Sequence, residues 1–482
     1  MNPTDFPASR NGSEFDLIVI GTGGGGTAAA IRAAELGYRV AIIEAGTIGG
    51  TCVNIGCIPS KAIIRAAKAY HTAGHHPFAG LRTRAEGVDW PQLISQKDHL
   101  VAELRQQKYI DILQSYDTIT LIQGHGRFNS RGEVVIDQNR VLRGDRVIIA
   151  TGAQPKILPI DGIDQVRVLN STTLMALERQ PESLLVIGGR AIALELGQAM
   201  ARLGTRVTIL QRSSRLLPEH DPEISRGIQE ALESEGIEVV TGAVPEKICE
   251  IDGQKEVTAR VNGSSRKFHA EGVLMAVGRV PNTDNLGLEE IGVTTDANGF
   301  ILVDAFLRTN RSGVFAVGDV TRLPKLVYVA AAAGTLAAEN ALTQAQRQLD
   351  LNVLPEVIFT DPQIATVGMT EQQAREAGHS VKVAHLPLEH VPRALTEQDR
   401  RGFIRLIADA DHNTLLGAHI LAAEAGEIIQ TAALAMEFGR RHGYTVDELR
   451  SMLFPYLTQV EGIKLAAQTF DKDVAKLSCC AG

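Results

Sequence analysis

Residues 15–44 read FDLIVIGTGGGGTAAAIRAAELGYRVAIIE, and this stretch sets the fold of the chain. A short apolar run leads into a glycine-rich turn, an alanine-rich segment follows, and a second apolar run ends in Glu44. The spacing of Gly21, Gly23 and Gly26 is that of a strand–turn–helix unit that binds a dinucleotide. The first glycine makes the tight turn, the second admits a pyrophosphate, and the third lets the helix pack on the strand. Glu44 is placed to accept hydrogen bonds from ribose hydroxyls.

A redox-capable pair of cysteines follows this unit directly. Residues 49–61 read GGTCVNIGCIPSK. Cys52 and Cys57 are too far apart for one regular helical turn, so we expect an irregular start at Cys52, with Cys57 inside a helix. Lys61 then lies one turn beyond Cys57 on the same face. A cation there favours the thiolate and lowers its pKa. The alternative is two buried thiols beside a surface lysine.

A second, looser copy of the nucleotide unit begins at Gly188. Gly188 and Ala193 take the small positions, and Arg190 stands where a third small residue is usual. The second strand ends in Gln211 and Arg212 instead of an acid. Gln211 offers no anionic acceptor to a ribose, and Arg212 is placed to face a 2′-phosphate, which favours NADPH over NADH. The alternative for Arg212 is a solvated surface charge.

Three later strands end in small-residue turns. Two of them run into Thr151-Gly152 and Gly278, and the third ends in Gly318-Asp319. Asp319 is placed to hydrogen-bond a flavin ribityl chain; the alternative is that it caps a helix, and the two roles are compatible. From Val353 onward, strands expected at 356–359, 381–386, 403–408 and 415–421 precede helices at 425–439 and 446–452. This last region has no glycine-rich signal, and an α+β domain of this kind could mediate dimerisation.

Composition and cysteine content narrow the class of protein. The 482 residues should form about two to four domains. A net charge of −8 argues against nucleic acid as the natural partner. The sequence has no apolar run of membrane-spanning length and no signal-peptide core, so we expect a cytoplasmic protein without a membrane partner. In that compartment paired cysteines are more often catalytic or metal-binding than structural. Four of the five cysteines are paired, and Cys249, alone in a strand-like stretch, is expected to be a buried thiol.

The segment 49–61 resembles the active-site motif of the FAD-dependent pyridine nucleotide-disulfide oxidoreductases, and the resemblance covers nearly the whole chain. It implies that NADPH reduces FAD and that the flavin reduces the Cys52/Cys57 pair. Cys57 would be the thiolate next to the flavin, and Cys52 the outer, exchanging thiol. Glu195 matches the family glutamate that pairs with the active-site lysine, here Lys61; its alternative is a surface carboxylate.

Two features separate this chain from the disulfide reductases of the family. Those members end in a His-Pro-x-x-x-Glu-type segment, whereas here Tyr456 stands at the histidine position and Glu461 remains. A tyrosine, with a pKa of about 10, is a poor base for disulfide exchange. The last residues, 477–482, include Cys479 and Cys480, and this tail resembles the mercuric reductase group, as do residues 454–468.

That resemblance implies a homodimer whose active sites are shared between subunits, with Hg(II) as the substrate. Cys479 and Cys480 would capture the soft ion and pass it to Cys52 and Cys57 of the other subunit. Tyr456 would lie beside the metal, which two electrons then convert to Hg(0). The runner-up is a flavin disulfide reductase such as dihydrolipoyl dehydrogenase. A metal-sequestering protein without turnover and a tail with incidental cysteines are the remaining alternatives.

Two departures from that group are also visible. Residues 1–14 read as a disordered lead with no room for an N-terminal metal-binding domain, and residues 166–172 contain no second active-site tyrosine. The predicted fold class is α/β, with two Rossmann-like dinucleotide-binding domains and a C-terminal α+β dimerisation domain. The expected domains are FAD-binding (15–160 and 280–350), NAD(P)H-binding (161–279) and dimerisation with the cysteine tail (351–482).

The predicted site residues fall into three groups. The catalytic residues are Cys52, Cys57, Lys61, Glu195, Tyr456 and Glu461. The metal-binding residues are Cys52, Cys57, Cys479 and Cys480. The cofactor-binding residues are Gly21, Gly23, Gly26, Glu44, Gly50, Thr51, Lys61, Thr151, Gly152, Gly188, Arg190, Glu195, Arg212, Gly278, Asp319 and Val327.

Overall fold

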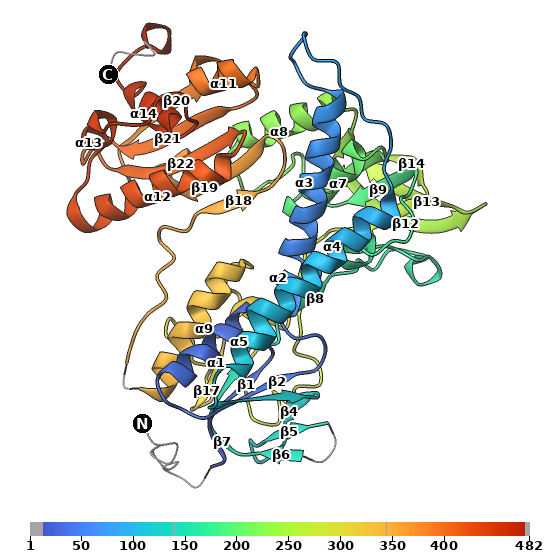
Figure 1. Ribbon diagram of the computed structural model, residues 1–482, viewed down its shortest axis with the longest axis vertical. Coiled ribbons are helices and arrows are strands. Elements are labelled where there is room, and N and C mark those ends of the chain that lie inside the picture. Colours follow the sequence, from blue (N-terminus) through green and yellow to red (C-terminus); the bar gives the residue numbers. More distant parts are fainter. Residues whose placement is uncertain (1–12, 138–139, 344, 478–482) are drawn as a thin grey trace.

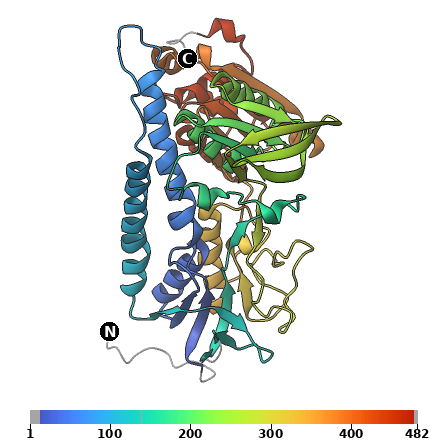
Figure 2. The ribbon, with the colours of Figure 1, turned by 90° about the vertical axis from the view of Figure 1, so that its right-hand side faces the viewer.

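The computed structural model describes residues 13–137, 140–343 and 345–477, and it is built around three sheets (Figure 1). Two of the sheets are parallel and are covered by helices, and the third is antiparallel. The fold class predicted from the sequence is therefore confirmed. In the side view the first sheet lies at one end of the molecule and the other two lie together at the opposite end (Figure 2). No helix in the described part of the chain is long and apolar enough to cross a membrane.

The first sheet is formed by the glycine-rich unit and later strands. Its order is β17-β7-β1-β2-β3, and helices α1 and α9 pack on one face through a core of leucine, valine and alanine side chains. A small three-stranded sheet, β4-β5-β6, covers the other face. Its members are β1 (Phe15–Ile20), α1 (Gly24–Glu35), β2 (Val40–Glu44), β3 (Ile119–Gln123), β4 (Gly126–Phe128), β5 (Val134–Ile136), β6 (Arg140–Leu142), β7 (Gly144–Ile149), β17 (Val314–Ala316) and α9 (Val327–Leu342).

The second sheet repeats this plan in the order β11-β10-β9-β15. Helices α7 and α8 pack on one face, and the antiparallel meander β12-β13-β14 covers the other. The chain leaves the first unit through β8 and returns from the second unit through β16, and these two strands pair antiparallel. The elements are β8 (Ala153–Pro155), α6 (Ser171–Leu174), β9 (Ser183–Ile187), α7 (Ala191–Arg202), β10 (Arg206–Gln211), α8 (Pro222–Ser234), β11 (Glu238–Thr241), β12 (Ala243–Ile251), β13 (Gln254–Val261), β14 (Ser264–Ala270), β15 (Gly272–Met275) and β16 (Arg279–Pro281).

The third sheet has the order β18-β19-β22-β21-β20. Helices α12 and α14 pack on one face, while the other face packs on α8 of the second unit through Ile364, Phe403 and Leu421. The sheet therefore shares a core with the second unit. Its elements are β18 (Glu356–Ile358), β19 (Gln363–Gly368), α10 (Glu371–Glu376), β20 (Val381–Pro387), α11 (Pro392–Glu397), β21 (Phe403–Asp409), β22 (Leu415–Ala422), α12 (Ala425–His442), α13 (Val446–Ser451) and α14 (Glu461–Gln468).

A helical arm joins the first sheet to the other two. It consists of α2 (Gly50–Ile55), α3 (Cys57–Gly74), α4 (Trp90–Arg105), a π-helical turn (Gln106–Ile110) and α5 (Asp111–Gln114). In Figure 1 α3 runs from the middle of the molecule up to the second unit, where it packs on α7. The dithiol segment at the start of α3 consequently lies between the two nucleotide units.

The expectation of a buried Cys249 is wrong. Cys249 is only partly buried on β12. Because successive side chains of a strand point to opposite faces, the buried neighbour Ile248 takes the core position and turns Cys249 outward.

Candidate active site

The two cysteines of the dithiol lie on two consecutive helices. Cys52 belongs to the short helix α2, and Cys57 is the first residue of α3. The break between them is at Gly56, whose φ of −127° and ψ of −110° are not helical. The prediction that Cys57 lies in a helix is confirmed, but the irregular start expected at Cys52 is wrong. Gly56 interrupts the helix instead, because it can adopt a backbone conformation that other residues avoid.

The environment makes the two thiols unequal. A hydrogen bond from the Cys52 thiol lowers the pKa of Cys57 to about 7; burial opposes the shift, and the Lys61 charge adds to it. The same hydrogen bond and burial raise the pKa of Cys52 well above its ordinary value. Cys57 also begins an 18-residue helix, whose N-terminus favours negative charge. Around neutral pH Cys57 is therefore ionised in a large share of the molecules, and its thiolate accepts a hydrogen bond from the Cys52 thiol.

Lys61 meets Glu195 from the second unit. Its Nζ donates to Glu195 Oε2 at 2.7 Å and lies 4.7 Å from the ring centroid of Phe359. Glu195 Oε1 accepts from the Phe359 backbone N–H at 2.9 Å. The side chain of Glu195 is 7% exposed, so its alternative as a surface carboxylate is wrong. The structure brings Lys61 and Glu195 together across 134 residues of sequence.

The first glycine turn fits a dinucleotide pyrophosphate. Gly21 has a φ of +107°, and a Cβ there would collide with the Ala150 carbonyl oxygen. A Cβ at Gly26 would collide with the carbonyl oxygen of Gly21, so this glycine is needed for helix α1 to approach β1. Nothing lies within 4 Å of the Cβ position at Gly23, which leaves open space above the turn and the start of α1. A helix N-terminus facing such a space is a site for phosphate groups.

The dithiol segment packs directly on this turn. A Cβ at Gly50 would lie 3.1 Å from the Gly23 backbone nitrogen and closer still to its Cα, so only glycine fits. Thr51 follows in α2. Glu44 Oε2 accepts hydrogen bonds from the backbone N–H, 3.1 Å away, and the hydroxyl of Thr22. Its Oε1 accepts from the Gly46 backbone N–H at 2.7 Å. The carboxylate is thereby held at the end of β2, as a ribose acceptor requires.

A buried, incompletely paired ion pair suits a flavin. Arg279 Nε lies 3.7 Å from Asp319 Oδ2 and has no hydrogen-bond partner among the residues that the structure describes. Burial raises the pKa of Asp319 and lowers the pKa of Arg279. An orphaned buried donor of this kind calls for an absent partner, and the polar edge of FAD would supply one.

The alternative reading of Asp319 as a helix cap is wrong. Asp319 lies inside a short 3₁₀ turn (Gly318–Val320) whose N-cap is Val317, and no side chain caps that turn. Val327 starts α9 beside Gly24, with a side-chain methyl 2.9 Å from that glycine's Cβ position. Thr151 donates its hydroxyl to Asn282 O at 2.7 Å, which ties together the turns that hold Gly152 and Gly278.

The second glycine turn reproduces the first with different side chains. Gly188 has a φ of +123°, and a Cβ there would collide with the Ala276 carbonyl oxygen. Arg190 precedes α7 and lies 3.4 Å from Glu219, with both side chains largely exposed. Gln211 is buried, whereas Arg212 is exposed. This exposure suits a 2′-phosphate contact and a solvated charge equally, so both readings of Arg212 stay open.

Tyr456 and Glu461 are not brought to the dithiol within this chain. Tyr456 is 54% exposed in the loop before α14, and Glu461 is the buried first residue of that helix. Glu461 Oε2 accepts from the Leu457 backbone N–H at 3.2 Å. Figure 1 places α14 on the third sheet and α2 near the middle of the molecule, below α3. The predicted tail residues Cys479 and Cys480 lie outside the described residues.

Sequence reasoning missed Tyr109. It belongs to the π-helical turn after α4, and its ring Cγ lies 3.3 Å from the Cβ position of Gly49, just before the dithiol. Burial raises the pKa of Tyr109, and charge on Cys52 and Cys57 adds to this. A π turn inserts one residue into a helix and is frequent at functional sites. No periodicity in the sequence predicts this π turn.

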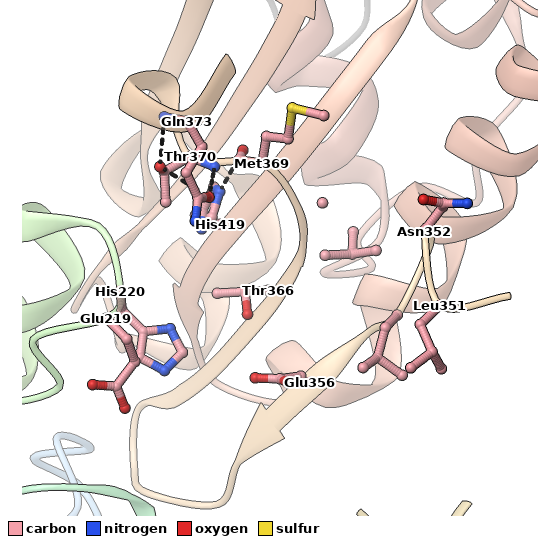
Figure 3. A pocket seen from close by; sticks show the side chains of 13 residues that line it. Glu219, His220, Leu351, Asn352, Glu356, Thr366, Met369, Thr370, Gln373 and His419 are labelled. Carbon is pink, nitrogen blue, oxygen red and sulfur yellow. Dashed lines mark hydrogen bonds between the residues drawn. The ribbon is translucent and has the colours of Figure 1, made fainter. Parts of the chain in front are cut away.

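A cavity of about 420 Å³ lies apart from the redox residues, between the second unit and the third sheet (Figure 3). Glu219 and His220 line one side, and Glu356, Thr366 and His419 line the other. Burial lowers the pKa of His220 and His419 and raises that of Glu356, so neutral forms are favoured. The cavity contains none of the predicted catalytic residues.

Comparison with known proteins points to one family. The family model of the pyridine nucleotide-disulphide oxidoreductases matches residues 15–334, and that of their dimerisation domain matches residues 354–467. The mercuric reductase of Lysinibacillus sphaericus is 46% identical over 98% of this chain and 85% of its own length. That of Streptomyces lividans is 45% identical over 97% of this chain and 98% of its own.

Solved structures show the same architecture. The Cu(II) complex of the HOCl-induced flavoprotein disulfide reductase RclA from Escherichia coli has a TM-score of 0.84 and 29% identity, covering 94% of this chain and 99% of that chain. LpdA from Mycobacterium tuberculosis has a TM-score of 0.84 and 27% identity over the same shares.

Proposed function

Because the chain belongs to the pyridine nucleotide-disulphide oxidoreductase family, we propose that it is a mercuric reductase, an NADPH-dependent FAD enzyme that reduces Hg(II) to Hg(0). The overall reaction is NADPH + Hg²⁺ → NADP⁺ + H⁺ + Hg⁰, in which the hydride supplies both electrons. Two mercuric reductases that match nearly the whole chain at 45–46% identity support this choice over the disulfide reductases. The reaction would take place in the cytoplasm.

The observation that carries the proposal is the unequal dithiol. A Cys57 thiolate beside a Cys52 thiol offers two sulfur ligands, and soft metal ions prefer thiolates. Binding of Hg(II) between the sulfurs would displace the Cys52 proton. Lys61 and Glu195 would keep a balanced charge beside the sulfurs while the metal arrives. Tyr456, which stands at the histidine position of the disulfide reductases, would serve a metal site that needs no disulfide base.

Two nucleotide sites would supply the electrons. Gly21, Gly23, Gly26 and Glu44 would hold FAD on the first unit, and Arg279 with Asp319 would meet its polar edge. When bound, FAD carries electrons between the nicotinamide and the dithiol. NADPH would lie on the second unit over Gly188, with Arg190 and Arg212 near its phosphates. The proposed domains are 15–160 with 280–350 for FAD, 161–279 for NADPH and 351–482 for dimerisation.

The active site would be completed by a second copy of the chain. Residues 354–467 match a dimerisation domain, and the loop before α14 exposes apolar side chains, with Leu453 95% exposed and Met452 50% exposed. In a homodimer this loop would bring Tyr456 and Glu461 to the dithiol of the partner subunit. The tail cysteines Cys479 and Cys480 would deliver Hg(II) by the same route.

The test is NADPH oxidation by the purified flavoprotein with Hg(II) in excess thiol and, separately, with lipoamide or oxidised glutathione. We expect oxidation that depends on Hg(II) and is lost in Cys57→Ser. The double variant Cys479→Ala/Cys480→Ala should be impaired under limiting thiol competition. Turnover of a disulfide without turnover of Hg(II) would make the chain a disulfide reductase and overturn the proposal.

A further inference from the structure

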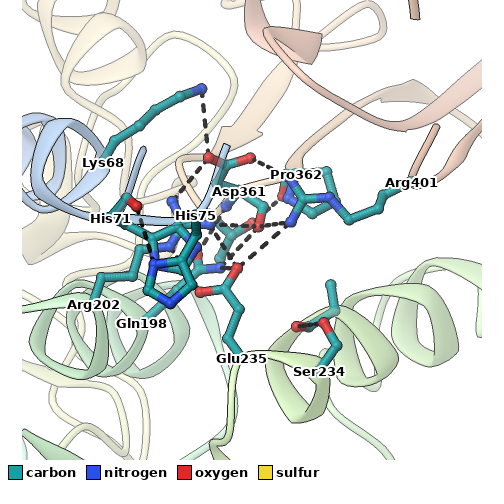
Figure 4. Close-up of polar contacts among 12 residues, drawn as sticks. Lys68, His71, His75, Gln198, Arg202, Ser234, Glu235, Asp361, Pro362 and Arg401 are labelled. Carbon is teal, nitrogen blue, oxygen red and sulfur yellow. Dashed lines mark hydrogen bonds and ion pairs between the residues drawn. The ribbon is translucent and has the colours of Figure 1, made fainter. Parts of the chain in front are cut away.

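Residues 359–362, which we call the strap, join β18 to β19 and lie against α7 of the second unit (Figure 4). Three residues of α7 face the strap: Glu195, Gln198 and Arg202. Their spacing of three and four residues puts them on one side of the helix. All three are buried, with 6%, 3% and 8% exposure. A polar face buried this deeply is costly unless every group has a partner.

The strap supplies those partners through its backbone. Glu195 Oε1 accepts from Phe359 N–H at 2.9 Å, and Gln198 Oε1 accepts from Asp361 N–H at 2.8 Å. Gln198 Nε2 donates to the Asp361 carbonyl oxygen at 2.8 Å. Side chains of α7 thus pair with the strap as a neighbouring strand would. The Phe359 ring, in turn, lies under the Lys61 ammonium.

The Asp361 carboxylate anchors the strap in a cluster of charges (Figure 4). Its Oδ2 accepts from Arg202 Nη1 at 2.8 Å and lies 3.5 Å from Lys68 Nζ, and its Oδ1 accepts from Arg401 Nη2 at 3.0 Å. Burial would raise the pKa of Asp361, but Arg202, Lys68 and Arg401 hold it low, at about 2. Glu235 balances Arg202 at 2.7 Å. The carboxylate therefore joins α3, α7 and the third sheet at one point.

We propose that Asp361 is a positioning residue of the redox site: by anchoring the strap, it holds the Phe359 backbone on Glu195 and the Phe359 ring on Lys61, and so fixes the Lys61 ammonium beside Cys57. This inference rests on the proposed function in one respect only, namely that the dithiol is redox-active. The ionisation of Cys57 is measurable without Hg(II), so the two can fail separately.

The direction of the effect follows from the charges near Cys57. The Lys61 charge lowers the pKa of Cys57, and the Glu195 charge raises it by less. Held in place, the pair has a net lowering effect. A loosened strap would remove one of the two partners of the Glu195 carboxylate and the ring beneath Lys61, so that Lys61 would spend more time hydrated and away from the sulfur. The pKa of Cys57 would then rise.

The experiment compares Asp361→Asn with Asp399→Asn in the dithiol-reduced holoenzyme. Asp399 accepts two hydrogen bonds from Arg401 at 2.8 Å, so its change removes a charge from the same cluster. The pH midpoint of the Cys57 thiolate is followed by thiolate–flavin charge-transfer absorbance and by alkylation of the Cys57 peptide in mass spectrometry. We expect Asp361→Asn to raise the midpoint by about half a unit to one unit, and Asp399→Asn to leave it in place.

A second variant decides the matter if Asp361→Asn does not fold. Phe359→Leu keeps the cluster and the backbone but removes the ring from Lys61, and it should raise the midpoint by a smaller amount. Asp361→Glu, which keeps the charge, should lie closer to the original protein than Asp361→Asn. A midpoint in Asp361→Asn no higher than in Asp399→Asn, or an unchanged midpoint in Phe359→Leu where Asp361→Asn cannot be made, would overturn the proposal.

Discussion

The two nucleotide units of this chain agree in their backbones and differ in their side chains. Gly21 and Gly188 both have a positive φ, and a Cβ at either would collide with the carbonyl oxygen of the residue that follows the neighbouring strand, Ala150 after β7 or Ala276 after β15. Ala193 and Gln211 follow Gly188 at the distances at which Gly26 and Glu44 follow Gly21. Steric exclusion of a Cβ therefore requires glycine at this turn in both units. The residues around the turn can differ, and these differences can determine which ligand binds.

The side-chain differences fall where a ligand or another domain would touch. Glu44 ends β2 in the first unit, and the neutral Gln211 ends β10 in the second. Helix α1 carries Ala28 and Ile31 where α7 carries Glu195 and Gln198. The first helix packs against α9 through small apolar side chains, whereas the second presents a polar face to the strap. In the first unit the helix therefore supports only the cofactor turn, whereas in the second unit it also links the strap to Lys61.

The largest effect is expected from Gly26→Ala. Its Cβ would collide with the carbonyl oxygen of Gly21, so α1 must move away from the turn. Such a backbone collision costs several kcal/mol, and bound flavin per chain should fall about a hundredfold. The measurement is the flavin-to-protein absorbance ratio after gel filtration. The matched variant in the second unit, Ala193→Gly, should retain its flavin. Equal flavin loss in both variants would contradict the assignment of FAD to the first unit.

The second prediction tests the difference in charge at the strand ends. Arg212→Ala combined with Gln211→Glu should weaken NADP⁺ binding about ten- to a hundredfold, because a charge-assisted contact contributes about 1.5–3 kcal/mol. Binding of NAD⁺ should be kept or improved. Calorimetry on the oxidised holoenzyme measures both. Arg206→Ala, an exposed arginine on the same strand, is the control. Unchanged NADP⁺ affinity would assign Arg212 to the solvated surface.

The third prediction concerns the lysine that bridges the two units. Lys61→Met removes a charge that lowers the pKa of Cys57, so this pKa should rise from about 7 toward its ordinary value. The thiolate fraction at pH 7, and with it the alkylation rate of Cys57, should fall about fivefold. Arg65→Met, one turn further along α3 and exposed, should change neither. An equal rate in Lys61→Met would mean that the hydrogen bond from Cys52 alone sets the thiolate.

The sequence predicts this site unevenly, for physical reasons. Glycine turns, paired cysteines and the strands around them are local patterns, so both units were recognisable along with the pairing of Lys61 and Glu195 that the family resemblance implied. Gly56 as the breaking point was not, because a helix interruption depends on how the two halves pack. The position of Cys249 on the outer face of β12 depended on register, which a strand-like run alone does not fix.

Apart from the pairing of Lys61 with Glu195, the contacts between distant segments could not be predicted from the sequence. The hydrogen bond from Phe359 to Glu195 spans 164 residues, and the strap carries no motif that the site needs. Tyr109 lies beside Gly49, just before the dithiol, in a π-helical turn that no sequence pattern predicts. Strand β19 was missed because residues 363–368 show no clear alternation, being buried in a shared core on one face and a second core on the other. Sequence patterns therefore found the sites, and tertiary packing supplied the residues that hold them.

The smallest effect is expected on stability at acidic pH. There, the charged contacts of α7 with the strap should depend on pH, whereas the apolar contacts of α1 should not. Arg202, Lys68 and Arg401 lower the pKa of Asp361 to about 2 despite its burial. Its charge therefore stabilises the folded state in full at pH values above the unfolded-state pKa of about 4. That stabilisation, at most about 2 kcal/mol, is lost as the pH falls toward 2. The original protein and Asp361→Asn are compared by the denaturant concentration at the midpoint of their first unfolding transition. The difference between the two midpoints should become smaller as the pH falls from about 5 to about 3. Glu35→Gln on the exposed end of α1 should show no such change. A gap that is independent of pH would place the contribution of Asp361 in the shape of its side chain and not in its charge.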